Sequence, residues 1–191
     1  MIRAFLALEL SEEILVRYAA LHGRESARRR GLRWVHPGNI HVTLRFLGDT
    51  AENRIETLRR EVDGVTLGIA PFRVSIGNPG CFGPQASPQV LWFGIDEGAS
   101  RLAFLAEGIE DAVRRLDLPP EDRPWRAHLT VARNPGRVRF DDWETVLREA
   151  GICGLCFEAR EVTLLSSKLG PQGPSYTMVF KSTLKGYSSP H

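Results

Sequence analysis

One four-residue pattern occurs twice in this chain and restricts how two of its strands must be arranged. It reads His-Val-Thr-Leu at positions 41–44 and, 87 positions later, His-Leu-Thr-Val at positions 128–131. Alternate side chains of a strand point to opposite faces, so each copy puts a His and a Thr on one face and two apolar residues on the other. We therefore predict two strands that are each anchored in a core and together present two imidazoles to a shared cleft.

The rest of the chain alternates between strand-like and helix-like segments. Apolar spacing predicts helices at 12–30, 52–63, 99–116 and 141–150, and strands at 2–10, 40–47, 71–77, 89–95, 126–133, 157–166 and 175–183. The Gly- and Pro-rich stretch at 78–88 is predicted to be a loop, and the one at 167–173 is predicted to be a hairpin loop that joins the last two strands. The order strand, helix, motif strand, helix repeats roughly, which indicates two similar α+β lobes. We expect one bilobal domain over residues 1–185, with one copy of the pattern in each lobe, and a loose tail at 186–191.

The composition excludes several classes of protein. The net charge of the 191 residues is +2, which gives no strong field for nucleic acid. Of the 25 basic residues 22 are arginines, which suit phosphate recognition, although a high-GC genome would enrich arginine as well. No stretch approaches the ~18 apolar residues of a membrane span, and the N-terminal apolar run lacks the features of a signal peptide, so we expect a cytoplasmic protein with no membrane partner. Three cysteines are too few for a disulfide framework or a zinc site, and we interpret Cys153 and Cys156 as structural.

The two histidines suit acid–base chemistry near neutral pH. An imidazole donates a proton when it is cationic and accepts one when it is neutral, so His41 and His128 together can supply one acid and one base. The hydroxyls of Thr43 and Thr130 can donate hydrogen bonds to phosphate oxygens. No carboxylate or third ligand stands at metal-binding spacing near either copy, which favours a reaction without a metal. The competing interpretation, core histidines held by backbone groups beside threonines that only favour strands, fits either copy alone better than it fits both.

Longer segments around the two copies resemble a known family. Trp-Val at 34–35 followed by Asn-Ile-His-Val-Thr-Leu-Arg-Phe-Leu-Gly at 39–48 resembles its first signature, and Arg-Pro-Trp-Arg-Ala-His-Leu-Thr-Val-Ala-Arg at 123–133 resembles the second. Residues 3–7 and 167–176 are similar to further family segments in the expected order. The family is that of the 2H phosphoesterases, named for two His-x-Thr-x motifs, and specifically the bacterial and archaeal RNA 2′,3′-cyclic phosphodiesterases, historically called 2′-5′ RNA ligases.

This resemblance implies a fold and a reaction. The fold is α+β and bilobal, with two pseudo-symmetric, mostly antiparallel sheets facing a central cleft and helices on the outside. The reaction opens a 2′,3′-cyclic phosphate at an RNA 3′ end, or on a cyclic nucleotide, to leave a 2′-phosphomonoester, and it needs no metal or cofactor. His41 corresponds to the general acid and His128 to the general base, while Thr43 and Thr130 would hold the nonbridging oxygens. The reverse reaction would join RNA ends through a 2′-5′ linkage, and water at ~55 M makes this ligation minor.

Three further residues are candidates for substrate binding. The family places an aromatic residue and an arginine at the positions of Phe46 and Arg133, where they can sandwich the terminal base. Each lies five positions after its histidine, so strict alternation would direct both away from the cleft unless the strand ends or bulges first, for which Gly48 offers a reason only in the first copy. Arg45 stands at even spacing from His41, so we predict that Arg45 reaches the phosphate. Core packing for Phe46 and a surface position for either arginine stay open.

Other functions remain compatible with the sequence. The same chemistry could act on another small cyclic phosphate or on a 2′-5′ oligoadenylate, because base-binding residues lie on loops. A module that only binds RNA ends is a further alternative, but binding alone does not need two titratable groups. We expect contacts with the last one or two nucleotides, given the modest net charge, and a monomer, since two lobes complete one site. Trp34 and Trp125 are interpreted mainly as packing residues, and Tyr176 as a packing or substrate-contacting residue.

Overall fold

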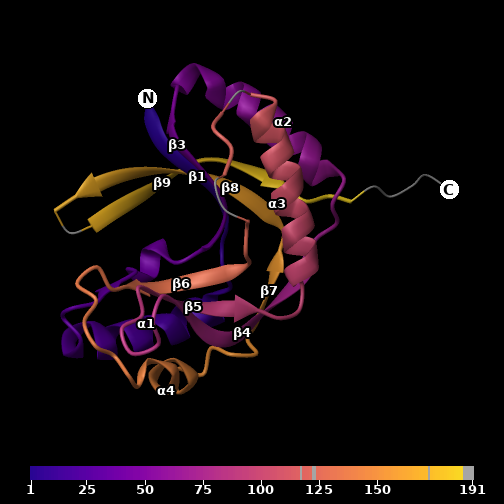
Figure 1. Ribbon diagram of the computed structural model, residues 1–191. Helices are drawn as coiled ribbons and strands as arrows, with labels where there is room; N and C mark the ends of the chain where they lie inside the picture. The colour runs from indigo at the N-terminus through magenta and orange to yellow at the C-terminus, as the bar shows by residue number, and fades with distance from the viewer. Residues whose placement is uncertain (117, 122–123, 172, 187–191) are drawn as a thin grey trace.

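Four strands form the first lobe of the computed structural model (Figure 1). The structure describes residues 1–116, 118–121, 124–171 and 173–186. In the order in which they lie side by side, the strands of this lobe are β9 (Gly173–Thr183), β8 (Glu161–Gly170), β1 (Ile2–Leu8) and β3 (Val42–Thr50). All neighbours in this lobe pair in the antiparallel sense.

The second lobe continues from the edge of β3. Its strands, again in spatial order, are β6 (His128–Arg133), β5 (Val90–Ile95), β4 (Phe72–Phe82) and β7 (Cys156–Ala159). The short β2 (Arg33–Trp34) also pairs with β6, outside this order. The lobes meet where β3 pairs with β6 through the single residue pair Val42 and Leu129. The nine described strands therefore form one continuous antiparallel sheet that is divided into two halves.

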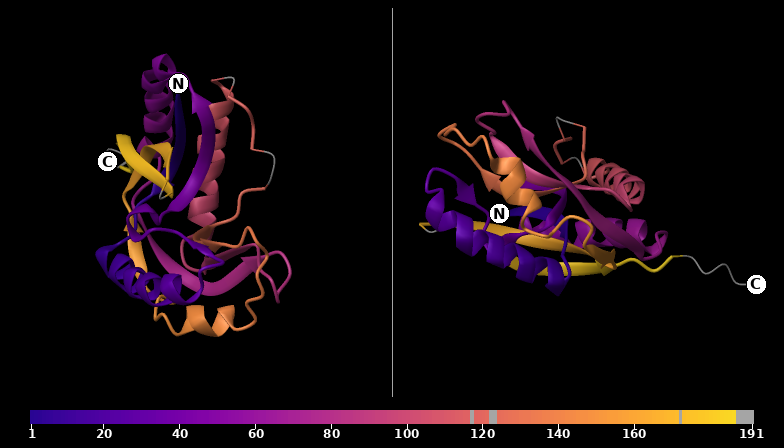
Figure 2. Two further views of the ribbon diagram at one scale, coloured as in Figure 1. Left: turned by 90° about the vertical axis from the view of Figure 1, so that its left-hand side faces the viewer. Right: turned by 90° about the horizontal axis from the view of Figure 1, so that it is seen from below.

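Four α-helices flank the two halves (Figures 1 and 2). They are α1 (Glu12–Arg28), α2 (Ile55–Leu67), α3 (Ala99–Arg114) and α4 (Trp143–Arg148), with 3-10 turns η1 (Pro37–Asn39) and η2 (Glu52–Arg54). Helices α2 and α3 lie side by side against the first lobe, while α1 and α4 lie against the second. The apolar spacing that predicts these helices also provides their buried faces, for example Leu102, Leu105 and Ile109 of α3.

Two of these helices cross from one lobe to the other. Helix α1 follows β1 of the first lobe but packs on the second, where the Tyr18 hydroxyl lies 2.6 Å from the carbonyl oxygen of Val35 and 3.0 Å from that of Val131. Helix α3 follows β5 of the second lobe but packs against β3 of the first. One hydrophobic cluster accordingly runs through both lobes. This shared core supports our proposal that residues 1–185 form a single domain.

The predicted fold class is confirmed: the fold is α+β, built on antiparallel strands in two similar halves with helices on the outside. Two of the predicted segments are wrong. The predicted loop 78–88 is strand as far as Phe82, because Pro79 and Gly80 occupy paired positions just after a register shift, where a proline is tolerated. The predicted strand 157–166 is two strands that break at Arg160. The predicted hairpin at 167–173 is confirmed, but its strands extend further than expected, until Gly170 lies opposite Gly173.

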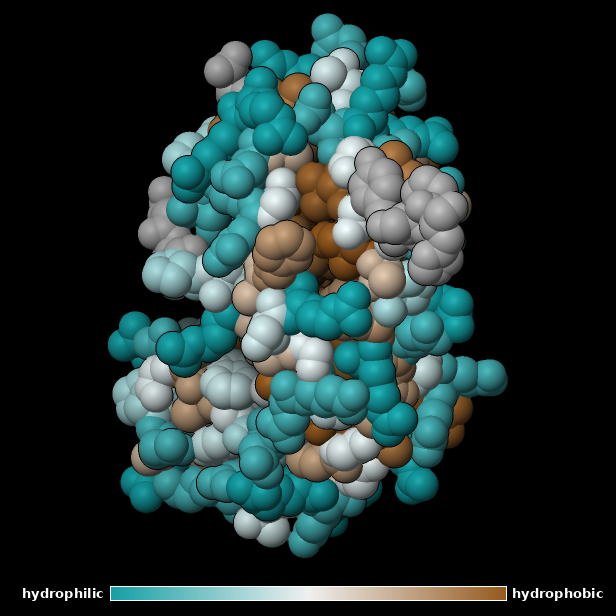
Figure 3. Space-filling view, turned by 90° about the vertical axis from the view of Figure 1, so that its right-hand side faces the viewer, coloured by the Kyte–Doolittle hydropathy of each residue, from teal (hydrophilic) through white to brown (hydrophobic). Residues whose placement is uncertain are grey.

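The side of the molecule that carries α2 and α3 is mostly hydrophilic, with a narrow apolar strip (Figure 3). Among the residues that the structure describes, no helix combines the length and the apolar character needed to cross a membrane. Residues 187–191 of the predicted tail lie outside the described part of the chain.

Candidate active site

The contact between β3 and β6 brings the two copies of the His-x-Thr pattern together. Val42 lies opposite Leu129, and both side chains are fully buried. Because neighbouring residues point to the other face and the strands are antiparallel, the histidine of each strand faces the threonine of the other. This geometry puts the two histidines at diagonal positions on one face. The Cα atoms of diagonal neighbours in an antiparallel pair are roughly 7–8 Å apart. A local twofold axis through the Val42–Leu129 pair thus relates the two copies.

The two imidazoles are held in the same way. His41 Nδ1 lies 2.7 Å from the carbonyl oxygen of Asn39, and His128 Nδ1 lies 2.7 Å from the carbonyl oxygen of Arg126. A carbonyl oxygen only accepts hydrogen bonds, so in both rings Nδ1 carries the proton and Nε2 is the nitrogen left for a ligand. His41 Nε2 lies 3.0 Å from the Thr43 hydroxyl, which therefore donates to it in the neutral ring.

The surroundings of both histidines favour the neutral form of the imidazole. Burial lowers the pKa of His41 to about 4; the hydrogen bond to the Asn39 carbonyl opposes this effect, and the positive charge of Arg133 adds to it. Burial also lowers the pKa of His128, again against a backbone hydrogen bond, and the charges of Arg133 and Arg126 lower it further. One arginine, Arg133, therefore acts on both imidazoles.

Aromatic side chains border each histidine. The His41 ring centroid lies 4.7 Å from that of Phe5 and 5.6 Å from that of Tyr176. The His128 ring centroid lies 5.5 Å from that of Phe82 and 6.3 Å from that of Trp92. The sequence is compatible with either packing or substrate contact for Tyr176, and the contact of this residue with His41 puts it in the site.

Sequence reasoning missed the other three aromatic residues. Phe82 could not be assigned to the site because its segment was predicted to be a loop. Phe5 and Trp92 come from strands that carry no His-x-Thr pattern. A usable signal for Trp92 is Gly80, its partner on β4. A Cβ atom at Gly80 would lie only 2.2 Å from the Trp92 ring, so the glycine lets this indole lie flat over β4 beside His128.

Two bulges decide where the residues after each histidine point. On β3, Leu6 pairs with Arg45 and Ala7 with Thr43, which leaves Leu44 as an extra residue. This shift brings Phe46 to the histidine face, where its ring centroid is 5.8 Å from that of Phe5 and its side chain is 52% exposed.

The second bulge does the same for Arg133. On β6, Thr130 pairs with Trp92 and Ala132 with Leu91, so Val131 is the extra residue. Arg133 is exposed and close enough to lower the pKa of both histidines. Strict alternation after the motifs is therefore wrong in both strands, and Phe46 and Arg133 lie on the side of the cleft.

The prediction that Arg45 reaches the phosphate is contradicted by its position. The first bulge turns Arg45 to the opposite face, together with its partner Leu6, and its side chain is only 6% exposed. Its guanidinium donates to the Glu110 carboxylate of α3 and to the carbonyl oxygens of Phe46 and Pro119. Arg45 thus ties α3 and the following loop to β3, behind the site.

The tryptophans before the motifs both pack against the core, as interpreted from the sequence, and Trp125 also connects the two lobes. Trp125 Nε1 donates to the carbonyl oxygen of Thr43 at 3.1 Å and so links the segment before β6 to β3. The backbone of Trp34 pairs with Ala132 of β6. In a similar way the Asn39 side-chain amide donates to the Pro174 carbonyl at 2.6 Å, which fixes the β9 end beside the His41 loop. Arg123 of the second signature lies outside the described residues.

No group of three or more His, Cys, Asp or Glu within the described residues is placed to hold a metal ion. Cys153 and Cys156 are both free thiols, and Cys156 Sγ accepts a hydrogen bond from Arg73 at 3.1 Å. The groups that this site offers for chemistry are two imidazoles, two hydroxyls and one nearby guanidinium.

Comparison with known proteins identifies the class to which this fold and site belong. The family model described as LigT like Phosphoesterase matches residues 8–92. An RNA 2′,3′-cyclic phosphodiesterase of Thermus thermophilus is 32% identical over 96% of this chain and 91% of that protein. One of Archaeoglobus fulgidus is 30% identical over 91% of this chain and 96% of that protein. The crystal structure of TT0787 of Thermus thermophilus superposes with a TM-score of 0.75 at 30% identity, over 96% of this chain and 98% of that one.

These similarities extend over nearly the whole chain and define a 2H phosphoesterase. More narrowly, the chain belongs to the LigT-like phosphoesterase family.

Proposed function

We propose that this protein is an RNA 2′,3′-cyclic phosphodiesterase that opens the cyclic phosphate to a 2′-phosphomonoester. The observation that carries the proposal is the twofold arrangement of His41, Thr43, His128 and Thr130 around the Val42–Leu129 pair. Relatives that are 30% or more identical over most of their length carry this activity in their names. Both lines of support point to cyclic phosphodiester hydrolysis.

In the proposed reaction the two histidines have opposite roles. His128 Nε2 takes a proton from a water molecule, whose oxygen attacks the phosphorus. The bond between phosphorus and the 3′ oxygen breaks, and His41 Nε2 gives its proton to that departing oxygen. The phosphate stays on the 2′ oxygen, and the next cycle begins when both rings have exchanged their protons with solvent.

The threonines would hold the group on which the histidines act. Each hydroxyl lies across from the histidine of the other strand, so the four side chains surround one phosphoryl group. In the structure Thr43 donates to His41 Nε2. When a phosphate enters, we expect the hydroxyl to turn to a nonbridging oxygen, which frees Nε2 for its role as acid.

The low pKa of His41 has to be reconciled with its role as acid. A pKa of about 4 leaves only a small protonated fraction of His41 at neutral pH. A phosphodiester between the two rings carries a negative charge, and an opposite charge within ~4–6 Å favours the protonated imidazole. Substrate binding and protonation of His41 are thus coupled in our proposal, so the site is charged correctly only when it is filled.

The remaining predicted residues would bind the terminal nucleoside. Phe46 is half exposed on the histidine face and Arg133 is exposed at the end of β6, so each offers a surface on which a base can stack. We also propose that the reaction needs no metal and that reversal gives minor 2′-5′ ligation. A cytoplasmic location and a monomeric state stay predictions.

The direct test is hydrolysis of adenosine 2′,3′-cyclic phosphate by the purified protein in EDTA. We expect adenosine 2′-phosphate as the sole product, at a rate that EDTA does not change. His22→Ala is a matched control because His22 lies on α1, outside the site. Formation of the 3′-phosphate, or hydrolysis that stops in EDTA and returns with an added divalent ion, would contradict the proposal.

A further inference from the structure

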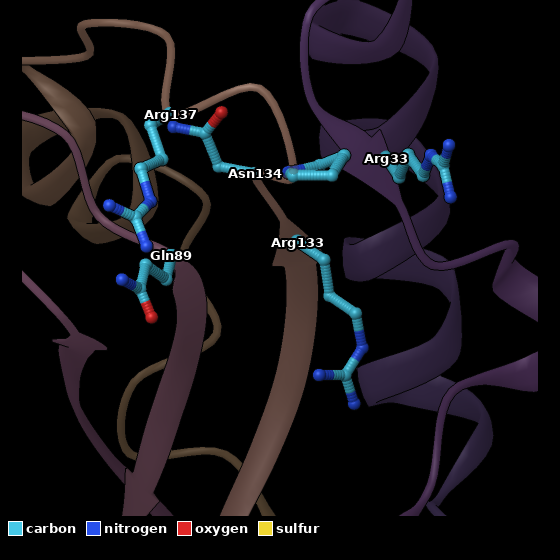
Figure 4. Close-up of a pocket in the computed structure, with 6 residues that line it drawn as sticks. Arg33, Gln89, Arg133, Asn134 and Arg137 are labelled. Atoms are coloured by element: carbon cyan, nitrogen blue, oxygen red, sulfur yellow. The ribbon is translucent and has the colours of Figure 1, made fainter.

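A cavity of about 320 Å³ lies at the end of β6, beyond the histidines (Figure 4). Its volume is at the lower end of the range for pockets that hold small ligands. Three arginines but no carboxylate line it, so it suits a negatively charged group. The complete lining is Arg33, Gln89, Arg133, Asn134, Pro135 and Arg137.

The arginines that line this cavity form no ion pair with a carboxylate among the described residues. Elsewhere the guanidinium groups are commonly ion-paired, as Arg45 is with Glu110 and Arg29 with Asp142. Within the described ranges of the chain, none of the ion pairs uses an arginine that lines the cavity. A guanidinium group that is not paired with a carboxylate can hold a phosphate, since it can donate two parallel hydrogen bonds.

Arg137 is held in the cavity by an unusual backbone conformation. Its φ is +50°, in the left-handed region that is uncommon for residues other than glycine. The turn is fixed by Asn134, which is 2% exposed and both accepts from the Val138 amide at 2.9 Å and donates to the Val138 carbonyl at 2.7 Å. A glycine would adopt this conformation at lower cost. An arginine there indicates that its side chain has a use that offsets the strain.

The cavity continues from the candidate active site. Arg133 lines it and is also the residue whose charge lowers the pKa of both His41 and His128. Thr130 and Arg133 are three residues apart on β6, which corresponds to roughly 10 Å at the rise of a strand. In Figure 4 the Arg137 side chain extends from its turn toward Gln89, and Arg133 extends along β6. Arg33 borders the cavity from the other side and extends away from Arg137.

Building on the proposed function, we propose that this cavity binds a phosphate on the 5′ side of the terminal nucleotide, with Arg137 and Gln89 as its main contacts. In this proposal the cyclic phosphate lies between the histidines, the nucleoside lies beside Arg133, and the preceding phosphate lies at Arg137. The preferred substrate is then the end of an RNA chain and not a free cyclic nucleotide. Arg137 provides the local positive charge for this contact, although the net charge of the whole chain is only +2.

The test compares three substrates that differ only on the 5′ side: adenosine 2′,3′-cyclic phosphate with a 5′-hydroxyl, the same nucleotide with a 5′-phosphate, and a dinucleotide that ends in it. We expect kcat/KM to rise about tenfold from the first to the third, the value of about one charge-assisted hydrogen-bonded contact. A gain with the 5′-phosphate alone would assign the cavity to a terminal phosphate, and a gain only with the dinucleotide would assign it to a phosphodiester.

Arg137→Gly separates binding from folding. It removes the side chain and relieves the positive φ, so we expect an unchanged or slightly higher Tm, unchanged hydrolysis of the 5′-hydroxyl substrate and loss of the gain with the dinucleotide. Arg137→Asn, which tolerates the same φ, should behave alike, and Arg60→Ala on α2 is the arginine control. Equal kcat/KM for all three substrates, or an equal loss on all three in Arg137→Gly, would overturn the inference.

A binding experiment tests the inference independently of the proposed function. If no cyclic substrate is opened, the proposed function fails, and affinity for a fluorescent tetranucleotide with a 2′-phosphate end decides the inference. We expect Arg137→Gly to weaken this binding about tenfold and to reduce the slope of log K against log[salt] by about 0.7, the loss of one phosphate contact on a single strand. Unchanged affinity and slope would overturn it.

Discussion

The His41 half and the His128 half of the site share one pattern but differ in what surrounds it. Both rings donate from Nδ1 to the carbonyl two residues earlier, and both strands carry a bulge just after the threonine. The His41 half is the more enclosed, with Phe5 and Tyr176 against the ring and a hydroxyl on Nε2. The His128 half has Phe82 and Trp92, and two arginine charges act on it. A symmetric backbone thus supports an asymmetric pair of titrating groups.

The largest expected effect is the loss of either imidazole. His41→Ala and His128→Ala should each lower kcat for cyclic nucleotide hydrolysis by about 10²–10⁴-fold, the usual contribution of a positioned general acid or base. Thermal melting should show that both variants fold, because both side chains are only partly buried. A loss below about tenfold in either variant would mean that only one half of the pair takes part in catalysis.

Arg45 and Arg133 follow the two motifs in similar positions, but replacing them should have different effects: loss of Arg45 should reduce stability, and loss of Arg133 should reduce substrate binding. Arg45→Ala should lower the free energy of unfolding by about 2–3 kcal/mol, because it leaves the partly buried carbonyl oxygens of Phe46 and Pro119 without their donor and removes one of the two arginines paired with Glu110. Arg133→Ala should leave stability within about 0.5 kcal/mol, as for other exposed positions, and weaken substrate binding. Urea denaturation measures the change in stability, and KM measures the change in substrate binding. A stable Arg45→Ala variant with a raised KM would place Arg45 in the site.

The threonines should contribute less than the histidines. Thr43→Val and Thr130→Val keep the shape and remove the hydroxyl, and each should lower kcat/KM by about tenfold, the value of a hydrogen bond to a charged group. Only Thr43→Val should also change the pH profile. It removes the hydroxyl that donates to neutral His41, so the pKa of His41 should rise. Equal profiles for the two variants would mean that the halves are equivalent.

The pH dependence should show the smallest but most characteristic difference. The base must be neutral and the acid protonated, so kcat/KM falls below the pKa of one histidine and above that of the other. Burial lowers both pKa values, to about 4 for His41 and below the usual value for His128, so the maximum should lie below pH 6.5. Arg133→Gln removes a charge that lowers both pKa values and should move the whole profile to higher pH. A flat rate up to about pH 8 would show that His41 keeps its proton in the free protein.

The sequence was sufficient for the motif strands but not for the residues just beyond them. Alternation correctly puts Val42 and Leu129 in the core, because these four-residue stretches are regular strand. Alternation predicts the wrong face for Arg45 and Arg133, because the bulges at Leu44 and Val131 each insert one residue and so reverse the faces of the residues that follow. Neither bulge position is a glycine, so the sequence gives no indication of a bulge there.

The aromatic borders and the arginine cavity could not be predicted for a different reason. They are made by residues from separate strands and turns, and only the pairing of these elements brings them together. Trp92 lies beside His128 because β5 pairs with β6, and Arg137 reaches the cavity because Asn134 fixes its turn. Local patterns contain no information about such contacts, although Gly80 indicates a close approach.

The opposite roles of the two histidines are the central claim, and a substrate with sulfur in place of the bridging 3′ oxygen tests them most directly. A thiolate leaves without a proton, so it does not need the general acid. We predict that this substrate restores hydrolysis by His41→Ala to within about tenfold of the unmodified protein and leaves the loss in His128→Ala unchanged. Restoration of His128→Ala instead, or of both variants equally, would contradict the assignment of His41 as acid and His128 as base.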